Sequence, residues 1–220
     1  VMKGYQIGLQ EGMDIMVKID GDGQMDPSHI GYLISPILNG QANYTKGNRF
    51  VSVEGLKSMP RIRLVGNALL SLACKLSSGY WNIFDPTNGY TAIDAVTAAL
   101  LPFHKISARF FFETDMLFRL YLEGAVVVDR PMHAVYGSEL SNLSALHSIP
   151  EFTYKHAMNT FKRLIYCYYV RDMPLASVEL AVGLVLFCFG LSTGVFHWML
   201  SSITGSLTTP GTVMLSALPT

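Results

Sequence analysis

The residues best suited to chemistry lie in one acidic, glycine-rich segment, DGDGQMDP at positions 20–27. The segment follows an apolar run at residues 15–19, which predicts a buried strand. That strand would deliver the carboxylates of Asp20 and Asp22 to its C-terminal end, and open α/β sheets bind ligands at this edge. Asp22 can supply a carboxylate oxygen and Gln24 a carbonyl oxygen, so we predict a site for a hard divalent cation. The cation could offset charge on a departing nucleotide diphosphate.

Two other interpretations of this segment stay open. It could be a plain surface turn, because Asp and Gly are common turn residues. It could also be a calcium loop between two helices, but such a loop carries a glutamate at its twelfth position. Counted from Asp20, that position holds Gly31, so the calcium loop is the weaker alternative.

The segments around the motif alternate between strand and helix patterns, which predicts a layered α/β fold. We predict strands at residues 15–19, 43–53, 110–112 and 125–128, and helices at residues 1–12, 30–38, 60–78, 95–101 and 115–123. Asp94 and Thr114 are the predicted caps of the last two helices, and Pro27 is expected at a first helical position.

The C-terminal third predicts contact with a membrane. Residues 149–173 favour an amphipathic helix on the membrane surface, with Phe161 and Ile165 on its apolar face. An ordinary amphipathic core helix is the alternative. Residues 180–200 contain no Asp, Glu, Lys or Arg and would span about 30 Å as a helix, the thickness of a hydrocarbon core. A second apolar run begins at Pro210, so we expect a membrane hairpin, and the basic residues before it place the main domain on the cytoplasmic side.

The composition narrows the function classes. Lys plus Arg and Asp plus Glu each number 16, so nothing in the charge balance indicates a nucleic-acid partner. The three cysteines share no metal-type spacing, which favours free thiols in a reducing compartment. The chain also begins and ends inside predicted elements, so we expect a fragment.

Five motifs follow one another in the order of a known family. DGDGQMDP resembles a DxD region, KGNRF at 46–50 a "GSR" element, and DPTNGY at 85–90 a "DPxSGF" element. Glu113-Thr-Asp115 begins an acidic helix, and residues 131–143 resemble the loop before the membrane helices. In this combination, nearly the whole chain is similar to family 2 glycosyltransferases of the polyprenyl-phosphate branch, that of dolichyl-phosphate mannose synthase.

The resemblance implies a fold, an activity and partners. The fold would be GT-A-like, a Rossmann-like α/β sheet with helices on both faces, here truncated at its N-terminus. Residues 1–148 would form a partial catalytic domain, 149–173 the membrane-surface helix, and 174–220 a transmembrane helix and the start of a second. The enzyme would move a sugar from a GDP- or UDP-sugar to a polyprenyl phosphate with inversion. The fragment alone is expected to be inactive, because the base pocket would precede Val1.

The resemblance also assigns roles to residues. Asp20, Asp22 and Gln24 would bind the nucleotide-sugar and hold Mg²⁺ or Mn²⁺ with its diphosphate. Arg49 would bind the acceptor phosphate.

One departure concerns the helix after Pro60. The family often places an Arg about four residues before a Ser, whereas this chain has Asn67 before Ser71. Arg61 and Arg63 are the candidates to replace that arginine at the acceptor phosphate.

The acceptor determines the mechanism that we expect. A lipid phosphate is already an anion, so it needs positioning and charge neutralisation more than a general base. If the acceptor were a sugar hydroxyl, Asp115 could act as the base beside Glu113. The alternative is that both acids only stabilise the first turn of their helix.

Two other function classes remain as alternatives. A processive polysaccharide synthase normally carries a QxxRW motif, and this string does not occur in the chain. A non-catalytic membrane scaffold with the same fold would bind neither nucleotide-sugar nor metal. The sequence leaves the sugar, the lipid and homo-oligomer formation open.

Overall fold

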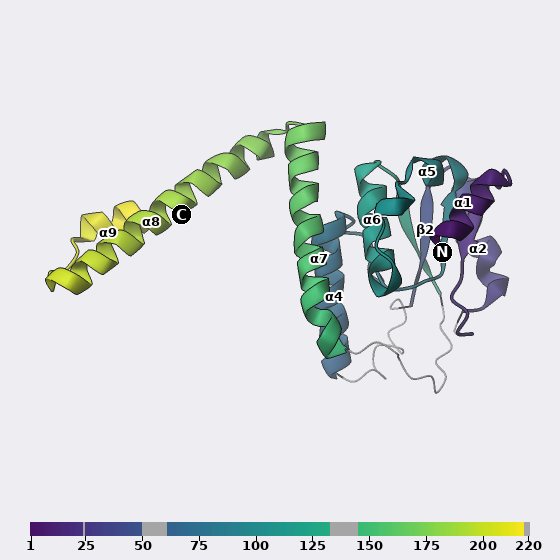
Figure 1. Ribbon diagram of the computed structural model, residues 1–220, viewed down its shortest axis with the longest axis horizontal. Coiled ribbons are helices and arrows are strands. Elements are labelled where there is room, and N and C mark those ends of the chain that lie inside the picture. The colour runs from purple at the N-terminus through teal and green to yellow at the C-terminus, as the bar shows by residue number, and fades with distance from the viewer. Residues whose placement is uncertain (24, 50–60, 133–144, 218–220) are drawn as a thin grey trace. The chain divides into compact units, whose positions relative to one another are not determined.

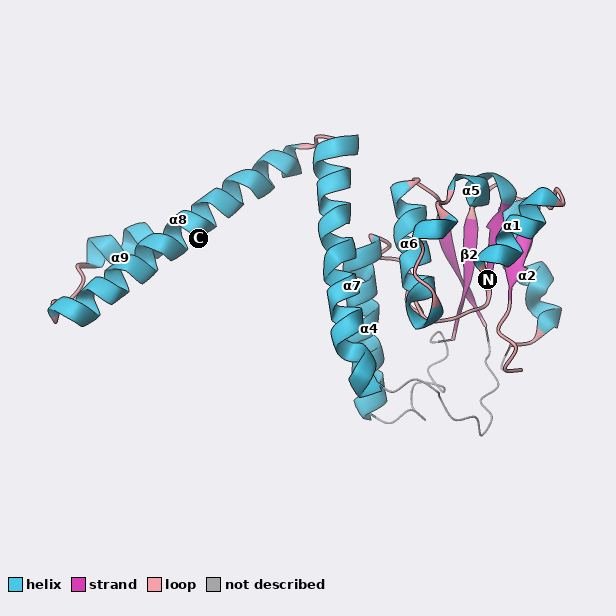
Figure 2. Cartoon of the chain, viewed as in Figure 1, coloured by secondary structure: helices cyan, strands magenta, loops and turns pink. Residues whose placement is uncertain are grey.

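Within the described part of the chain, four short strands form one mixed sheet, and their directions decide where the candidate functional residues meet. The strands are β1 (Ile15–Lys18), β2 (Tyr44–Asn48), β3 (Thr91–Asp94) and β4 (Val127–Pro131), in the spatial order β1-β3-β2-β4. β2 and β4 are parallel, while β3 is antiparallel to both of its neighbours. The C-terminal ends of β1, β2 and β4 therefore lie at the same edge of the sheet as the start of β3 (Figure 2).

The computed structural model describes residues 1–23, 25–49, 61–132 and 145–217 (Figure 1). The chain divides into two units, Val1–Arg163 and Leu164–Thr220. The sheet lies in the first unit, and the long apolar helix predicted at the C-terminus lies in the second.

Side chains on the strands alternate between two hydrophobic cores, as the period of a strand requires. Met16 and Ile93 point into the larger core, whereas their neighbours Val17 and Ala92 point into the smaller one. The larger core is completed by residues of α1 (Met2–Gln10), α4 (Arg61–Ser78), α5 (Ala95–Leu100) and α6 (Phe112–Leu122), and the smaller one by residues of α2 (Ile30–Leu38). The predicted α/β class, with helices on both faces of the sheet, is confirmed.

Two predicted helix starts are confirmed by their capping bonds. The Asp94 carboxylate accepts a hydrogen bond from the Thr97 N–H at 2.6 Å and caps α5. Asp26 accepts one from Ser28 N–H at 2.8 Å and caps the 3-10 turn η1 (Pro27–His29). A side-chain oxygen at this position satisfies an N–H group that has no partner inside the helix.

The strand predicted at residues 110–112 is wrong, and a strand at 91–94 was missed. Two 3-10 turns, η2 (Phe103–Lys105) and η3 (Arg109–Phe111), lead directly into α6. α6 begins at Phe112, so Thr114 is not its cap. A short apolar run is ambiguous between strand and helix, and here the buried side chains of Phe111 and Phe112 continue onto the core face of α6.

Helix α7 (Ala145–Ile165) presents polar side chains to the first unit. The His156 Nδ1 lies 2.8 Å from the Ser77 Oγ of α4, and these two helices run side by side in Figure 1. Asn159 donates to Asp115 at 3.0 Å, and the Arg163 Nε donates to the Leu76 carbonyl at 3.2 Å. The outward residues of α7 include three large apolar ones, Tyr154, Phe161 and Ile165.

Helix α4, like α7, exposes large apolar side chains and buries small or polar ones. The apolar face predicted for this helix is exposed along its described length, at Val65, Leu69, Leu72 and Leu76. The buried positions of its C-terminal half are instead taken by smaller residues, Cys74, Ser77 and Ser78. Both helices thus direct several large apolar side chains away from the core, while Phe152 of α7 packs against the buried Phe111 ring.

Up to residue 217, where the described part ends, the second unit contains three helical segments after the end of α7. A π-helical segment, η4 (Tyr166–Arg171), precedes α8 (Leu175–Thr204), and α9 (Pro210–Ala217) folds back along α8 in Figure 1. α8 is long and apolar enough to cross a membrane by its length and composition. The two helices are in contact near Gly194, where a Cβ would lie at an ordinary van der Waals distance of 3.9 Å from the Ser216 Cβ.

Two glycines that follow helices differ in one respect, which gives a stability test. Gly79 after α4 and Gly124 after α6 have φ of +90° and +73°. A Cβ on Gly79 would also lie 2.6 Å from the Tyr121 ring, whereas one on Gly124 would meet nothing within 4 Å. We expect Gly124→Ala to cost roughly 1–2 kcal/mol of unfolding free energy.

Gly79→Ala should cost about 1–3 kcal/mol more, because it overpacks the core as well. Chemical denaturation of the two variants and the wild type in the same detergent measures the difference. Equal losses in both variants would contradict the contact with Tyr121.

Candidate active site

The edge of the sheet where β1, β2 and β4 end collects most of the residues that the sequence singled out. Lys18 closes β1, with Asp20 and Asp22 directly after it. Arg49 follows β2, and the turn at 85–90 leads into β3 from the same edge. Loops at the carboxyl ends of parallel strands are the usual ligand sites of open α/β sheets.

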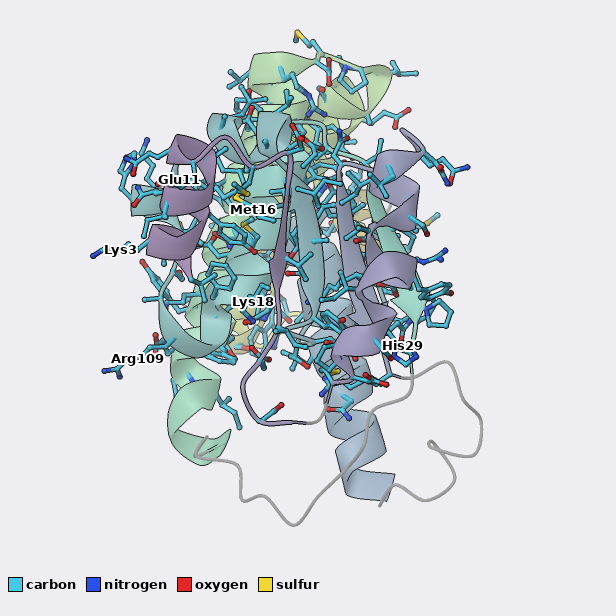
Figure 3. The ribbon with its side chains drawn as sticks, turned by 90° about the vertical axis from the view of Figure 1, so that its right-hand side faces the viewer. Lys3, Glu11, Met16, Lys18, His29 and Arg109 are labelled. Carbon is cyan, nitrogen blue, oxygen red and sulfur yellow. The ribbon has the colours of Figure 1, made fainter. Side chains whose placement is uncertain are left out.

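Lys18 joins two of the predicted acids. Its Nζ lies 2.7 Å from Asp20 Oδ1 and 3.0 Å from Glu113 Oε1, and it also donates to the Gly89 carbonyl at 3.2 Å. Figure 3 shows Lys18 where β1 leaves the sheet. Burial alone would lower the pKa of Lys18, but Glu113 and Asp20 outweigh it and the pKa lies above its ordinary value. Lys18 therefore stays charged and holds both carboxylates in place.

Asp20 packs tightly against the turn that precedes β3. A Cβ built on Gly89 would lie 1.8 Å from Asp20 Oδ2, so no other residue fits at Gly89 without displacing the carboxylate. The motif DPTNGY therefore requires glycine at position 89 because the Asp20 carboxylate occupies the space of a side chain there, a contact that the sequence alone did not show.

Of the residues predicted to hold the cation, the structure describes Asp20 and Asp22. Asp22 is exposed on the turn after β1, and the φ of +71° at Gly23 is a conformation that glycine adopts without strain. Gln24 lies outside the described residues. Within the described chain, no three His, Cys, Asp or Glu residues group as a self-sufficient metal site would require. A hard cation at Asp22 would therefore need further oxygen ligands, such as those of a bound diphosphate.

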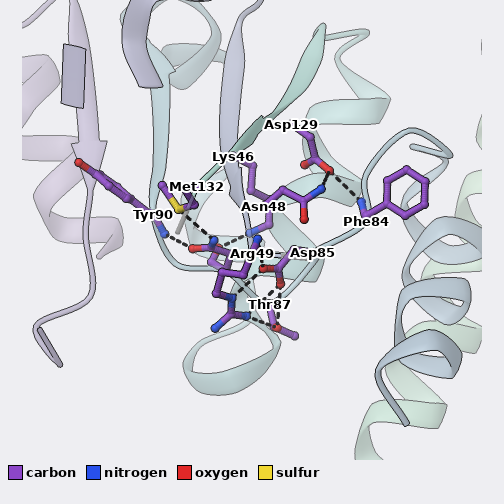
Figure 4. Close-up of polar contacts among 10 residues, drawn as sticks. Lys46, Asn48, Arg49, Phe84, Asp85, Thr87, Tyr90, Asp129 and Met132 are labelled. Carbon is purple, nitrogen blue, oxygen red and sulfur yellow. Dashed lines mark hydrogen bonds and ion pairs between the residues drawn. The ribbon is translucent and has the colours of Figure 1, made fainter. Parts of the chain in front are cut away.

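Arg49 forms a forked ion pair with a fully buried carboxylate (Figure 4). Its Nε donates to Asp85 Oδ2 at 2.7 Å and its Nη2 donates to Asp85 Oδ1 at 2.9 Å. Nη2 also donates to Thr87 Oγ1 at 3.2 Å. Such a fork fixes the plane of the guanidinium and offsets its charge. Arg49 lies at the predicted edge, and Asp85 determines its orientation.

Lys46 is a buried lysine that the sequence interpretation missed, although it stands in the KGNRF motif. Its side chain on β2 is completely buried, and its Nζ donates to the Asn88 carbonyl (Figure 4). Burial lowers its pKa, while nearby Glu113 and Asp85 act in the opposite direction. A lysine so deeply buried requires carbonyl or carboxylate partners, and Lys46 thereby ties β2 to the 85–90 turn.

Asp129 on β4 is a second buried group that the sequence did not identify. Its Oδ2 accepts hydrogen bonds from Asn48 Nδ2 and from the Phe84 N–H, both at 2.9 Å. Its Oδ1 is buried and has no hydrogen-bond partner among the described residues. Burial raises the pKa of Asp129 to about 6.

The two acids at the start of α6 lie in different places. Glu113 binds Lys18, whereas Asp115 accepts hydrogen bonds from the Ser107 N–H at 2.7 Å and from Asn159 Nδ2 at 3.0 Å. Residues two apart on a helix point in roughly opposite directions, about 200° around the axis. Asp115 is only 4% exposed, so its visible role is to join α6 and α7. Its role as a base stays a prediction.

The remaining predicted residues are less constrained. Arg61 and Arg63 lie in the first turn of α4, but their side chains fall outside the described part. Ser71 is half-buried farther along the same helix. The predicted loop at 133–143 also lies outside the described residues, so these acceptor-site assignments stay predictions.

The chain is similar to curated glycosyltransferases whose names state a polyprenyl-phosphate acceptor, and the predicted resemblance is thereby confirmed. No protein-family model matches the chain. Over 90 residues it is 37% identical to UDP-N-acetylglucosamine–dolichyl-phosphate N-acetylglucosaminyltransferase of Methanococcus voltae, a match that covers 41% of this chain and 34% of the relative.

Two bacterial relatives match over a longer stretch. The identity is 28% to undecaprenyl-phosphate mannosyltransferase of Micrococcus luteus, covering 59% of this chain and 52% of the relative. It is 25% to polyprenol monophosphomannose synthase of Mycolicibacterium smegmatis, covering 60% and 49%. The chain thus spans between a third and about half of the length of these relatives.

Solved structures give a weaker likeness. Glucosyl-3-phosphoglycerate synthase from Mycobacterium tuberculosis, in complex with Mn²⁺, UDP-glucose and glycerol 3-phosphate, has a TM-score of 0.45 and 19% identity. The similarity covers 74% of this chain and 54% of that one. This similarity concerns the general course of the chain only.

The raised pKa of Asp129 predicts a pH dependence of stability. The folded pKa of about 6 exceeds the ordinary value of 3.8, so the folded state binds more protons within this window. The free energy of unfolding should therefore fall as the pH rises from 3.8 to about 6. Asp129→Asn cannot ionise, so it should gain stability relative to the wild type across the same window.

Urea unfolding at several pH values measures this difference. Parallel pH profiles for the two proteins would show that Asp129 is not the group responsible.

Proposed function

We propose that this chain carries the acceptor side of a membrane-bound glycosyltransferase. The enzyme moves a sugar from a GDP- or UDP-sugar to a polyprenyl phosphate with inversion, and requires Mg²⁺ or Mn²⁺. The supporting observation is that one sheet edge brings the carboxylates after β1 together with the guanidinium after β2. The names of the curated relatives support the choice of acceptor.

On the donor side, this proposal gives Asp22 and Gln24 the cation and Asp20 the nucleotide. A bound Mg²⁺ or Mn²⁺ would offset the charge that develops on the departing diphosphate. Lys18 holds the Asp20 carboxylate at 2.7 Å, and Gly89 leaves the space that this carboxylate occupies. Asp20 is therefore oriented before the substrate arrives, which lowers the cost of binding.

On the acceptor side, the proposal gives Arg49 the lipid phosphate. A phosphate monoester is an anion at neutral pH and can attack the anomeric carbon without a general base, provided that it is held in line. The fork to Asp85 engages Nε and Nη2 and fixes the position and orientation of the planar guanidinium, which would present its remaining N–H groups to a phosphate. The internal hydrogen bonds of Asp115 agree with a reaction that needs no base at this residue.

The membrane location is supported by the inverted surfaces of two helices. Tyr154, Phe161 and Ile165 of α7 are exposed, while the polar His156 and Asn159 of the same helix are buried. Large exposed apolar groups are costly in water and favourable at a lipid surface. We propose that α7, within the predicted surface segment 149–173, lies at the bilayer and that α8 crosses it. The basic residues before α8 favour a cytoplasmic catalytic unit.

Removing the proposed cation ligand should abolish transfer. In full-length enzyme with Mg²⁺ or Mn²⁺, Asp22→Ala should lower kcat/KM at least about a hundredfold, because a metal offsets several kcal/mol of transition-state charge. The measurement is sugar transfer from a panel of nucleotide-sugars to a short polyprenyl phosphate.

Asp14→Ala is the matched control, since Asp14 is exposed just before β1, at the opposite end of that strand. Normal turnover by Asp22→Ala would refute the metal role.

Replacing the forked cation should affect the acceptor selectively. Arg49→Lys keeps the charge but loses the planar fork, so the KM for the polyprenyl phosphate should rise about tenfold while the KM for the nucleotide-sugar changes little. Steady-state kinetics with each substrate varied in turn measures both values. Arg171→Lys, in the second unit, is the control for the exchange of Arg for Lys, and a rise confined to the donor KM would contradict the assignment.

A further inference from the structure

A basic cavity in the first unit lies between α6 and α7. It has a volume of about 260 Å³ and is lined by the cations Lys105, Arg119, Lys155 and Lys162. We call the sheet edge where β1, β2 and β4 end the proposed catalytic edge. Of the residues described there, only Asp115 lines the cavity, and it points away from the Lys18–Glu113 pair. We propose that this cavity binds a phosphate group at a site separate from the catalytic edge.

The charge of the cavity is unusual for this chain. The whole chain has equal numbers of basic and acidic residues, yet four cations from η2, α6 and α7 converge here. Glu151 pairs with Lys155 at 2.6 Å. Lys105 and Lys162 form no ion pair among the described residues. Set against Asp115 and Glu151, the four cations leave an excess of two positive charges.

Arg119 supplies an independent indication of a ligand. Its Nε is buried and has no hydrogen-bond acceptor within the described chain. Its Nη2 donates only a long bond of 3.4 Å to the Lys105 carbonyl, and the guanidinium lies 5.0 Å from the Phe118 ring centroid. Because Nε is shielded from solvent, an anion in the cavity would meet the guanidinium at Nη2, whose bond to the Lys105 carbonyl is long.

Asp115 does not prevent an anion from binding. Its two oxygens accept hydrogen bonds from the Ser107 N–H and the Asn159 side chain, and its carboxylate is almost fully buried. The acid therefore belongs to the wall of the cavity and positions Asn159 on α7. The cations face the space that remains.

The donors favour phosphate over a carboxylate-bearing ligand. One guanidinium and three ammonium groups match the several oxygens of a phosphate, each through a charge-assisted hydrogen bond. Two sources share this chemistry, namely a phospholipid headgroup and free phosphate. The largely exposed Tyr154 also lines the cavity, and a tyrosine ring suits the boundary between lipid and water.

The test uses the full-length protein in a neutral detergent and titration calorimetry with two probes. The probes are inorganic phosphate and a short-chain, monomeric phosphatidic acid, with short-chain diacylglycerol, which carries no phosphate, as the uncharged comparison. Lys105→Gln and Lys162→Gln should each weaken binding of the phosphate-bearing probe about tenfold, because each removes one charge-assisted bond. Lys3→Gln, an equal charge change on α1, should leave the affinity unchanged.

The probes distinguish the two sources. If phosphatidic acid binds at least tenfold more tightly than inorganic phosphate and Tyr154→Ala removes this advantage, the ligand is a lipid headgroup. Equal affinities for the two probes identify free phosphate as sufficient.

The proposal is overturned if neither probe binds saturably, or if Lys105→Gln and Lys162→Gln bind as tightly as the wild type. Phosphate held at the catalytic edge would respond to Arg49→Lys instead. Failure of this site and failure of the proposed transferase function are therefore separable.

Discussion

The arrangement of the catalytic edge depends on three cations that hold one turn. Lys18 donates to the Gly89 carbonyl, Lys46 donates to the Asn88 carbonyl, and Arg49 forks onto Asp85. Lys18 and Lys46 lie on β1 and β2 and Arg49 directly follows β2, whereas these three acceptors lie in the six-residue turn before β3. Buried charges are stable only when such partners satisfy them. The turn and the two strands therefore stabilise one another.

In the proposed function, this mutual dependence would prepare the edge for a charged substrate. Lys18 is paired with Asp20 and Glu113, and Arg49 with Asp85, so each of these carboxylates has a fixed direction. A site whose charges are already oriented need not reorganise when a diphosphate or a lipid phosphate arrives. The charge of Asp129 is compensated less completely than that of the other carboxylates. One of its oxygens is buried without a partner in the described chain, and its pKa is raised to about 6.

The helices on the outside of the first unit follow a different physical rule. α4 and α7 bury small and polar residues and expose Leu69, Leu72 and Phe161. A water-soluble helix does the reverse, because its apolar face drives folding. Exposed apolar side chains are favourable where lipid, and not water, surrounds a helix. In the sequence, α7 is followed by a helix, α8, that is long and apolar enough to span a bilayer.

The sequence by itself determined the local features. The apolar run before Asp20, the helix start at Pro27, the capping residue Asp94 and the charge-free stretch within α8 all depend on residues close together in the chain. The DGDGQMDP segment likewise identified the end of β1 as a candidate site. The ambiguous run at 110–112 failed for the same reason, since local pattern alone cannot separate a short strand from a helix start.

Only the tertiary structure decided which of these features meet. Lys18 and Gly89 are 71 positions apart, and they touch because β3 runs antiparallel beside β1. The burial of Lys46, the pairing of Arg49 with Asp85 and the position of Asp115 between two helices have the same origin. Strand order and direction bring distant residues together, and no spacing along the chain encodes these contacts.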